Sequence, residues 1–285
     1  MNITAAFIGG GNMGGALIRG LIARGLPAQN ISVGEANQQR RVQLATELGV
    51  LVTADNREAA ADAEVVVLAV KPQDMSGTVQ SLAAAFEKRL PLVLSIAAGI
   101  RAADITRWCG PGISVVRAMP NRPALNGAGA TAMFAPPSVS TAHRELAAQV
   151  LGAVGTTVWV PDEESLDVVT ALSGSGPAYF FLLAELMTDA AVKLGLEHTA
   201  AQDLALQTLY GSGLMARQSD GDLARLRAEV TSKGGTTEAA LRSFEAANLR
   251  GIVNAALGAA TDRGREMART FGQSAGQSSE EKSRT

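Results

Sequence analysis

Cysteine, histidine and aromatic residues are scarce in this chain of 285 residues. The single cysteine, Cys109, has no partner for an internal disulfide or a thiolate metal site, so we expect no bound metal. The two histidines, His143 and His198, lie beside neither a glycine loop nor the end of an expected strand. Aromatic residues make up 4% of the chain and hydrophobic residues 47%, so alanine and glycine supply much of the apolar content.

The chain also lacks an excess of one charge and a long apolar run. Its net charge of −2 at pH 7 does not indicate a surface for polyanions, and we expect no nucleic-acid partner. No segment reaches about 18 uninterrupted apolar residues, the length that spans a membrane. The first 24 residues are largely apolar but lack the basic start of a signal peptide. The composition therefore predicts a cytoplasmic protein that does not associate with membranes.

Short β-rich runs alternate with helical patterns over residues 1–162. This alternation predicts right-handed βαβ units and a parallel sheet that is covered on both faces. The sequence thus predicts an α/β fold that begins with a Rossmann-type domain. The expected strands are Ala5–Gly9, Ile31–Gly34, Ala63–Val70, Pro91–Ile96, Ile113–Ala118 and Thr156–Val160, and the expected helices are Met13–Arg24, Gln38–Leu48 and Thr141–Leu151.

Beyond Pro161 the pattern becomes helical almost throughout, which predicts an all-helical domain over residues 163–271. Residues 272–285 are rich in Gly, Ser, Gln and Glu and are expected to form a disordered tail. The expected helices are Leu166–Leu172, Ala178–Leu194, Thr199–Gln218, Leu223–Glu229, Thr236–Ala246 and Gly251–Arg269.

A glycine cluster follows the first expected strand and opens the first expected helix. Gly9, Gly11 and Gly14 have the spacing G-x-G-x-x-G, with Asn12 and Met13 between the last two glycines. The first glycine permits a tight turn, the second lets the backbone approach a pyrophosphate, and the third lets the helix pack near the sheet. The free N–H groups of that helix would face the anion. Between a strand and a helix, the cluster predicts a dinucleotide site.

The residue that would contact the adenosine ribose is ambiguous. An acidic residue about 20 positions after the cluster binds the ribose 2′-hydroxyl of NAD. Glu35 lies 21 residues after Gly14 and meets that expectation. Arg40 and Arg41 are near enough to pair with the 2′-phosphate of NADP instead, although an arginine pair is equally compatible with a solvated helix face. The sequence leaves the choice between NAD and NADP open.

The scarcity of histidine bears on the chemistry. Alcohol and hydroxyacid dehydrogenases need a group that handles the hydroxyl proton, commonly a histidine. We expect surface or capping roles for His143 and His198. Reduction of a C=N bond needs less, because a cyclic imine can be protonated before the hydride arrives. The composition therefore favours an imine as substrate.

Three further segments carry polar groups where ligands commonly bind. Lys71 ends a strand and would face a cofactor or substrate, unless it is an ordinary loop lysine. Ser175 and Pro177 begin a long helix, as an N-cap and a first-turn residue. Val230–Thr237 joins two helices, and the N–H groups at the start of the second helix suit a carboxylate.

Together these segments resemble the pyrroline-5-carboxylate reductase family over about residues 4–268. Their order and spacing are jointly more specific than any one segment, and Val230–Thr237 is the most diagnostic. The chain departs from the family pattern at Lys233, where proline is usual, and at Arg122, where threonine is usual. The matching pieces are Phe7–Gly14, Ala69–Gln73, Ser95–Gly99, Arg117–Pro123 with Ala124–Ala130, Leu172–Tyr179 and Val230–Thr237.

The resemblance implies a Rossmann domain followed by a helical dimerisation domain, with self-association through the helices and larger ring assemblies common. It places the active site where the cofactor domain of one subunit meets the helical domain of another. The implied reaction is the last step of proline biosynthesis, the reduction of L-1-pyrroline-5-carboxylate to L-proline. NADPH is the usual donor in this family, with NADH as an alternative.

The resemblance also implies roles for individual residues. The Thr237 hydroxyl would hydrogen-bond the ring nitrogen of the substrate, and Ser232 with the N–H groups of Gly235 and Thr236 would hold its carboxylate. The implied substrate-binding set is Ser232, Gly234, Gly235, Thr236 and Thr237, with Thr237 catalytic. The implied cofactor-binding set is Gly9, Gly11, Asn12, Met13, Gly14, Glu35, Asn56 at the adenosine end, Val70, Lys71, Pro72, and Ala97, Met119 and Pro120 along the nicotinamide.

Two other functions compete with this one. A β-hydroxyacid dehydrogenase shares the domain order but expects a catalytic lysine with asparagine four residues later, whereas Lys193 is followed at that spacing by Glu197. A dinucleotide-sensing regulator would need the glycine cluster without the Val230–Thr237 loop, and should carry a partner surface. No basic recognition helix is apparent in the sequence.

Overall fold

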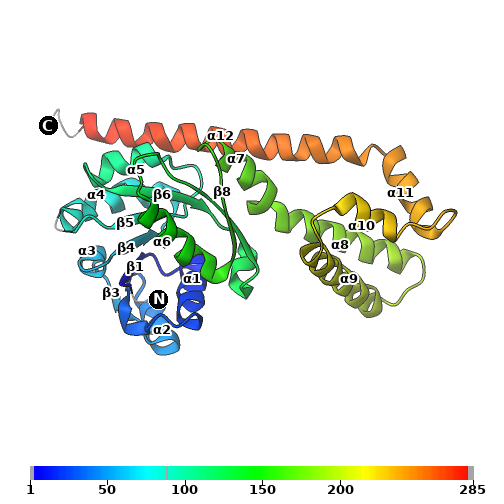
Figure 1. Ribbon diagram of the computed structural model, residues 1–285, viewed down its shortest axis with the longest axis horizontal. Helices are drawn as coiled ribbons and strands as arrows, with labels where there is room; N and C mark the ends of the chain where they lie inside the picture. Colours follow the sequence, from blue (N-terminus) through cyan, green and yellow to red (C-terminus); the bar gives the residue numbers. More distant parts are fainter. Residues whose placement is uncertain (1–2, 88, 282–285) are drawn as a thin grey trace. The chain divides into compact units, whose positions relative to one another are not determined.

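The computed structural model describes residues 3–87 and 89–281 (Figure 1). The chain divides into two compact units, Met1–Gly174 with Ala260–Thr285 and Ser175–Ala259. The first unit contains the whole sheet and the second is helical. The first unit also keeps α7 (Ser165–Val169), which the sequence assigned to the helical domain from residue 163.

Eight strands form one sheet in the order β3-β2-β1-β4-β5-β6-β7-β8. The neighbours from β3 through β6 pair in parallel, which confirms the predicted α/β, Rossmann-type fold. β7 is antiparallel to β6, so the sheet is mainly rather than wholly parallel. The strands are β1 Ala5–Ile8, β2 Ile31–Gly34, β3 Leu51–Thr53, β4 Val65–Leu68, β5 Leu92–Ser95, β6 Ser114–Met119, β7 Gly129–Phe134 and β8 Gly155–Trp159.

The sequence did not predict β3 or β7. β3 is only three residues long, and β7 begins with the small residues Gly129 and Ala130, which have little strand propensity. The connection from β6 to β7 holds one short 3₁₀ helix, Arg122–Asn126. A parallel crossover needs about a dozen or more residues, so this short connection returns the chain antiparallel.

The sheet buries one hydrophobic cluster on each face. Along β1, Phe7 joins the cluster under α1, α2 and α6, whereas Ala6 and Ile8 join the cluster under α3, α4 and α5. Alternate side chains of a strand point to opposite faces, which produces this division. The central strand β4 is buried along its whole length. The helices are α1 Asn12–Ala23, α2 Gln38–Leu48, α3 Asn56–Ala60, α4 Met75–Phe86, α5 Ala102–Cys109 and α6 Thr141–Leu151.

Local side-chain contacts account for several helix ends. Asn37 caps α2 by accepting the N–H of Arg40 at 2.9 Å. Ser140 caps α6 by accepting the N–H of His143 at 3.2 Å. His198 begins α9 (His198–Gln218), where the carboxylate of Glu197 caps the helix and the His198 side chain is exposed, so His198 has the surface role of the two that were expected.

The second unit contains four complete helices, which match predicted ones. α8 (Gly176–Lys193) packs against α9 (His198–Gln218), and α10 (Leu223–Glu229) and α11 (Thr236–Ala246) follow. A π-helix, Thr170–Gly174, precedes α8. Pro177 lies in the first turn of α8 as predicted, but Ser175 makes no side-chain capping hydrogen bond.

The last helix, α12, runs from Leu249 to Glu281. A disordered tail was predicted from residue 272, but the structure continues the helix through residues 272–281. This stretch contains no proline, and lengthening an existing helix avoids the unfavourable step of nucleation. Residues 282–285 of the predicted tail lie outside the described residues.

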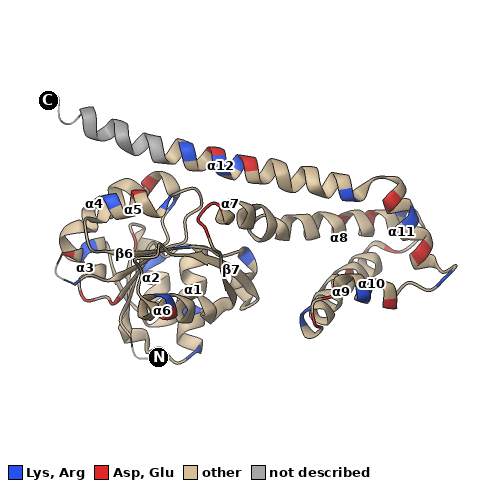
Figure 2. Cartoon of the chain, turned by 45° about the horizontal axis from the view of Figure 1, so that its top comes forward, with Lys and Arg blue, Asp and Glu red and all other residues tan. Residues whose placement is uncertain are grey.

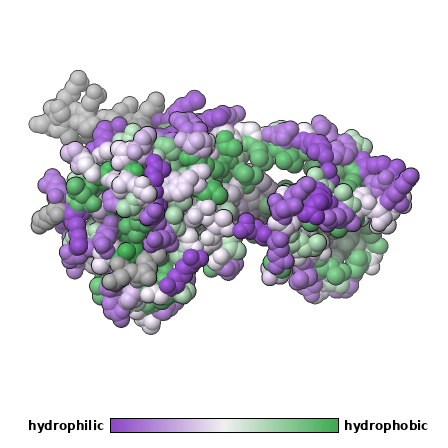
Figure 3. All heavy atoms as spheres, viewed as in Figure 1, coloured by the Kyte–Doolittle hydropathy of each residue, from purple (hydrophilic) through white to green (hydrophobic). Residues whose placement is uncertain are grey.

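Many large apolar side chains of the helical unit are exposed, among them Phe180, Phe181 and Leu186 of α8. Figure 3 shows hydrophobic residues on the surface of this unit. By length and composition alone, the helical stretch Ser165–Lys193 could cross a membrane. The sequence analysis did not predict this, because polar residues interrupt the apolar residues of this stretch. Acidic and basic residues are mixed along the described chain, without a large region of one charge (Figure 2). An apolar face of this kind marks a surface that binds another apolar surface.

Candidate active site

Five neighbouring strands, β2, β1, β4, β5 and β6, are parallel, so their carboxyl ends lie together at one edge of the sheet. β1 pairs with β2 on one side and with β4 on the other, so the strand order reverses there. Open α/β sheets bind ligands in the crevice at such a switch point. Five of the predicted cofactor residues follow or end these strands, namely Gly9, Glu35, Val70, Ala97 and Met119. The structure therefore brings together residues that span more than a third of the chain.

The glycine turn after β1 has no room for a side chain at Gly9 or Gly14, but it has open space at Gly11. Gly9 has φ +99°, and a Cβ there would lie 2.8 Å from the carbonyl oxygen of Ala69. A Cβ on Gly14 would lie 2.6 Å from the carbonyl oxygen of Gly9. A Cβ on Gly11 would meet no atom within 4 Å. Thus Gly9 and Gly14 are required by packing, whereas Gly11 borders open space.

That space fits a pyrophosphate. Gly11 is the N-cap of α1 and has no side chain that could satisfy the first N–H groups of the helix. Asn12, the first residue of α1, is exposed, and Met13 packs against the hydrophobic core. The uncapped helix start therefore presents N–H groups and the positive end of its dipole, the arrangement that binds phosphate.

Glu35 holds the glycine turn. One carboxylate oxygen accepts the N–H of Gly10 at 2.9 Å, and the other accepts the N–H of Asn37 at 2.9 Å. Arg40 lies on the same turn, because its Nε donates to the carbonyl oxygen of Gly10 at 2.9 Å. Arg41 donates to the carbonyl oxygens of Glu35 and Ala36. Among the described residues 3–87 and 89–281, Arg40 and Arg41 have no carboxylate within ion-pair distance.

Asn56 occupies the space that Gly34 leaves at the end of β2. A Cβ on Gly34 would lie 2.3 Å from the side-chain oxygen of Asn56. Asp55 caps α3 directly before it, and the hydrogen bonds from the Arg57 side chain and backbone lower the pKa of Asp55 to about 2. Asn56 is thus fixed next to the strand that leads to Glu35, as a contact to the adenosine end requires.

The residues predicted along the nicotinamide differ in exposure. Ala97 and Pro120 are buried, Met119 is half-buried, and a Cβ on Gly174 would lie 2.8 Å from the Met119 Cε atom. In the loop after β4, Val70 and Pro72 are half-buried and Lys71 is exposed. Lys71 makes no ion pair within the described part of the chain.

A buried network of charges was not predicted from the sequence. Arg117 of β6 pairs with Glu163 at 2.8 Å, and Arg101 pairs with Asp167 at 2.8 Å. The side chains of Arg117 and Asp167 are each 4% exposed. Burial lowers the pKa of Arg117, while Glu163 opposes that shift. The network fixes the start of α7 to the sheet and to the loop before α5.

The loop Val230–Thr237 precedes α11 in the second unit. Gly234 has φ +74°, and its N–H donates to the Glu238 carboxylate at 2.7 Å. Gly235 donates its N–H to the carbonyl oxygen of Ser232 at 3.0 Å, so this N–H is engaged inside the loop and does not point to a carboxylate as implied. The first-turn N–H groups of Thr236 and Thr237 have no intrahelical acceptor.

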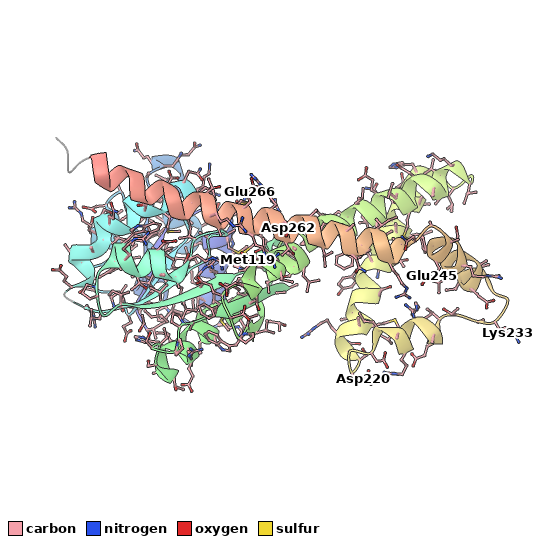
Figure 4. The ribbon with its side chains drawn as sticks, turned by 90° about the horizontal axis from the view of Figure 1, so that it is seen from above. Met119, Asp220, Lys233, Glu245, Asp262 and Glu266 are labelled. Carbon is pink, nitrogen blue, oxygen red and sulfur yellow. The ribbon has the colours of Figure 1, made fainter. Side chains whose placement is uncertain are left out.

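The side chains of this loop differ in their surroundings. Thr237 is half-buried, whereas Ser232 and Lys233 are exposed, with Lys233 at the tip of the loop (Figure 4). Glu238, which the sequence analysis did not single out, is the third residue of α11. A glutamate at the third position of a helix commonly accepts N–H groups at the helix start, so its place in the sequence could have predicted this contact.

Comparison with known proteins identifies the family. Residues 163–267 match the family model described as pyrroline-5-carboxylate reductase dimerisation, and residues 4–99 match NADP oxidoreductase, coenzyme F420-dependent. The pyrroline-5-carboxylate reductase of Pseudomonas aeruginosa is 49% identical over 268 residues, covering 94% of this chain and 98% of the relative. The chain belongs to the pyrroline-5-carboxylate reductase family. The Haemophilus influenzae enzyme of that name is 43% identical, over 93% of this chain and 98% of the relative.

Solved structures agree with this family. A pyrroline-5-carboxylate reductase of Coxiella burnetii matches with a TM-score of 0.90 and 40% identity over 93% of this chain and 98% of that chain. The Plasmodium falciparum enzyme with NADP bound matches with a TM-score of 0.81 and 27% identity over the same shares. A 3-hydroxyisobutyrate dehydrogenase of Mycobacterium tuberculosis, with a TM-score of 0.53 and 18% identity, shares the fold alone.

The family also accounts for the exposed helical faces. The stretch Ser165–Lys193 lies inside the region that matches the dimerisation model. Its exposed apolar side chains therefore lie in the region through which the family self-associates. This confirms the predicted self-association through the helical region.

Proposed function

We propose that this protein reduces L-1-pyrroline-5-carboxylate to L-proline with NADPH, in the cytoplasm. The observation that carries the proposal is a glycine at the N-cap of two helices, Gly11 of α1 and Gly235 of α11, neither of which has a side-chain cap. The start of α1 follows the Gly9–Gly14 turn at the sheet switch point, and the start of α11 follows the Val230–Thr237 loop. The first suits a dinucleotide and the second suits a small carboxylate.

The residues of the first unit hold the donor. The N–H groups at the start of α1 bind the pyrophosphate, and Asn56 contacts the adenosine end. Ala97, Met119 and Pro120 form an apolar surface for the nicotinamide. NADPH held by these residues would supply the hydride for the imine carbon, with the electron pair of the C=N bond passing to the ring nitrogen as the hydride adds.

The residues of the α11 loop hold the acceptor. The N–H groups of Thr236 and Thr237 bind the substrate carboxylate together with the Ser232 hydroxyl. The Thr237 hydroxyl hydrogen-bonds the protonated ring nitrogen and so fixes which face of the ring receives the hydride. Such positioning accounts for most of the rate of a reaction that needs no further proton at carbon.

The contacts of Glu35 and Arg40 favour NADPH over NADH. Both Glu35 oxygens are already engaged by backbone N–H groups, whereas Arg40 holds the glycine turn through Nε and has no ionic partner among the described residues. An open pocket of about 530 Å³ is lined by Glu35, Asn37, Gln39, Arg40 and Gln43. A 2′-phosphate in this pocket would give Arg40 the anionic partner that it lacks.

A spectrophotometric assay tests the activity. Protein mixed with pyrroline-5-carboxylate should oxidise NADPH faster than NADH, and L-proline should accumulate in proportion. A folded sample that consumes neither cofactor would refute the reductase and favour a dinucleotide-sensing regulator. Arg40→Ala should raise the KM for NADPH about tenfold more than the KM for NADH, because the contact to the 2′-phosphate is lost in addition to the hydrogen bond that supports the turn. Arg107→Ala, an exposed arginine that pairs with Asp104, is the matched control.

The positions of Lys193 and Glu197 argue against a β-hydroxyacid dehydrogenase. That class expects its catalytic lysine and the polar residue four positions later on one helix. Lys193 is the last residue of α8, whereas Glu197 is the N-cap of α9. The two side chains therefore belong to different helices and do not form that pair.

A further inference from the structure

One face of α12 between Thr261 and Phe271 packs against the rest of the first unit. Thr261, Gly264, Ala268 and Phe271 recur every three or four residues, which places them on one side of a helix. Thr261 and Ala268 are buried, and Gly264 and Phe271 are half-buried. The opposite side carries exposed charges that include Asp262 and Glu266 (Figure 4). The buried side therefore contacts the sheet unit over several turns.

This face lies on the loop between β5 and α5. A Cβ on Gly99 would lie 3.1 Å from Cδ2 of Phe271 and 3.4 Å from Cβ of Met267. Gly99 has φ +76°, so it is glycine for its conformation as well as for this close approach. Phe271 also packs against the hydrophobic cluster that includes Ala97. The loop that carries Ala97 is thus covered by the Met267–Phe271 stretch of α12.

The other end of the same loop is held by an ion pair. Arg101 donates to the Asp167 carboxylate at 2.8 Å and to the carbonyl oxygen of Glu163 at 3.2 Å. A Cβ on Gly264 would lie 3.7 Å from Cβ of Asp167, so α12 also packs on this acceptor. The loop from residue 96 to residue 101 is therefore fixed at Gly99 by packing and at Arg101 by charge.

We propose that the Thr261–Phe271 stretch of α12 positions this loop for the nicotinamide, with Phe271 and Arg101 as positioning residues. The proposal rests on the proposed NADPH site. Phe271 lies beyond residue 267, where the match to the dimerisation model ends. A small displacement of the loop would move Ala97 away from the nicotinamide without touching the adenosine end, and displacements of about 1 Å are costly to hydride transfer.

The test compares NADPH with adenosine 2′,5′-bisphosphate, which occupies only the adenosine end. Phe271→Ala should raise the Kd for NADPH about tenfold and leave the Kd for the bisphosphate unchanged. Phe271→Leu keeps an apolar side chain and should restore most of the NADPH affinity. Arg269→Ala, on the exposed side of the same helix, should change neither value.

If Phe271→Ala raises the Kd for both ligands equally, or changes neither Kd, the positioning role is wrong. If Phe271→Ala does not fold, Gly99→Ala perturbs the same contact from the loop side and must show the same split between the two ligands. Wild-type protein that fails to bind NADPH would refute the proposed function itself. That result is separate from the comparison of variants, because the positioning role concerns only the difference between the two ligands.

Discussion

The carboxylate of Glu35 accepts the backbone N–H of Gly10 across 2.9 Å and so joins the end of β2 to the turn after β1. Its second oxygen accepts the N–H of Asn37, and Arg40 donates to the carbonyl oxygen of Gly10. The acidic residue expected to bind a ribose hydroxyl is therefore a structural support of the glycine turn. Any change at this position alters both the shape of the turn and its charge.

These two effects can be separated by two substitutions at Glu35. Glu35→Gln keeps one acceptor oxygen but removes the charge, so we expect the ratio of kcat/KM for NADPH to that for NADH to rise about threefold to tenfold. Glu35→Ala should shift that ratio in the same direction and also raise both KM values, because the turn loses its support. Steady-state kinetics with both cofactors provide the measurement. An unchanged ratio in both variants would mean that the 2′ position is recognised elsewhere.

The glycines of α1 offer a matched pair of substitutions. A Cβ on Gly14 would lie 2.6 Å from the carbonyl oxygen of Gly9, whereas a Cβ on Gly15 would meet only the end of the Arg19 side chain at 3.4 Å. Gly14→Ala should push the helix off the turn and raise the Kd for NADPH at least tenfold. Gly15→Ala should bind normally and gain roughly 0.5–1 kcal/mol of stability. Similar NADPH affinity in the two variants would contradict the close packing of the third glycine.

The features predicted well from the sequence have local causes. α2 and α6 have the predicted bounds because Asn37 and Ser140 cap them and the signal lies within a few residues. β7 was missed because its strand character depends on pairing with β6. The Arg101–Asp167 pair joins residues 66 positions apart, and no local pattern marks which charges will meet. Long-range pairing of this kind comes from the fold, not from nearby sequence.

The Thr237 hydroxyl is expected to be the catalytic contact on the substrate. Thr237→Ala should lower kcat/KM for pyrroline-5-carboxylate at least tenfold, since one orienting hydrogen bond in the transition state is worth about 1.4 kcal/mol or more. Cofactor binding should stay unchanged, because the glycine turn of the first unit is untouched. Thr237→Ser retains the hydroxyl and should recover most of the activity. Kinetics of Thr237→Ala equal to wild type would remove this residue from the proposed mechanism.

The Arg117–Glu163 pair should be important for folding. Glu163→Gln leaves the Arg117 guanidinium, whose side chain is 4% exposed, without an anionic partner. Losing one partner of a buried pair commonly costs about 3–5 kcal/mol. Asp220→Asn breaks an ion pair with Arg225 whose side chains are 66% and 47% exposed, and should cost much less stability, because water screens an exposed pair. Urea unfolding of the two variants gives the comparison, and equal losses would contradict the burial of the network.

The Cys109 thiol makes stability depend on pH in the alkaline range. Burial raises its pKa from 9.0 to about 12. Between these values the unfolded chain loses the thiol proton while the folded chain keeps it, so the free energy of unfolding falls as pH rises, by up to about 1.4 kcal/mol per pH unit. The contribution is fully present below pH 9. Cys109→Ala should reduce the alkaline slope by that amount. Wild type at pH 8 should react with a thiol reagent only after unfolding, and rapid labelling of the folded protein would show that the thiol is accessible.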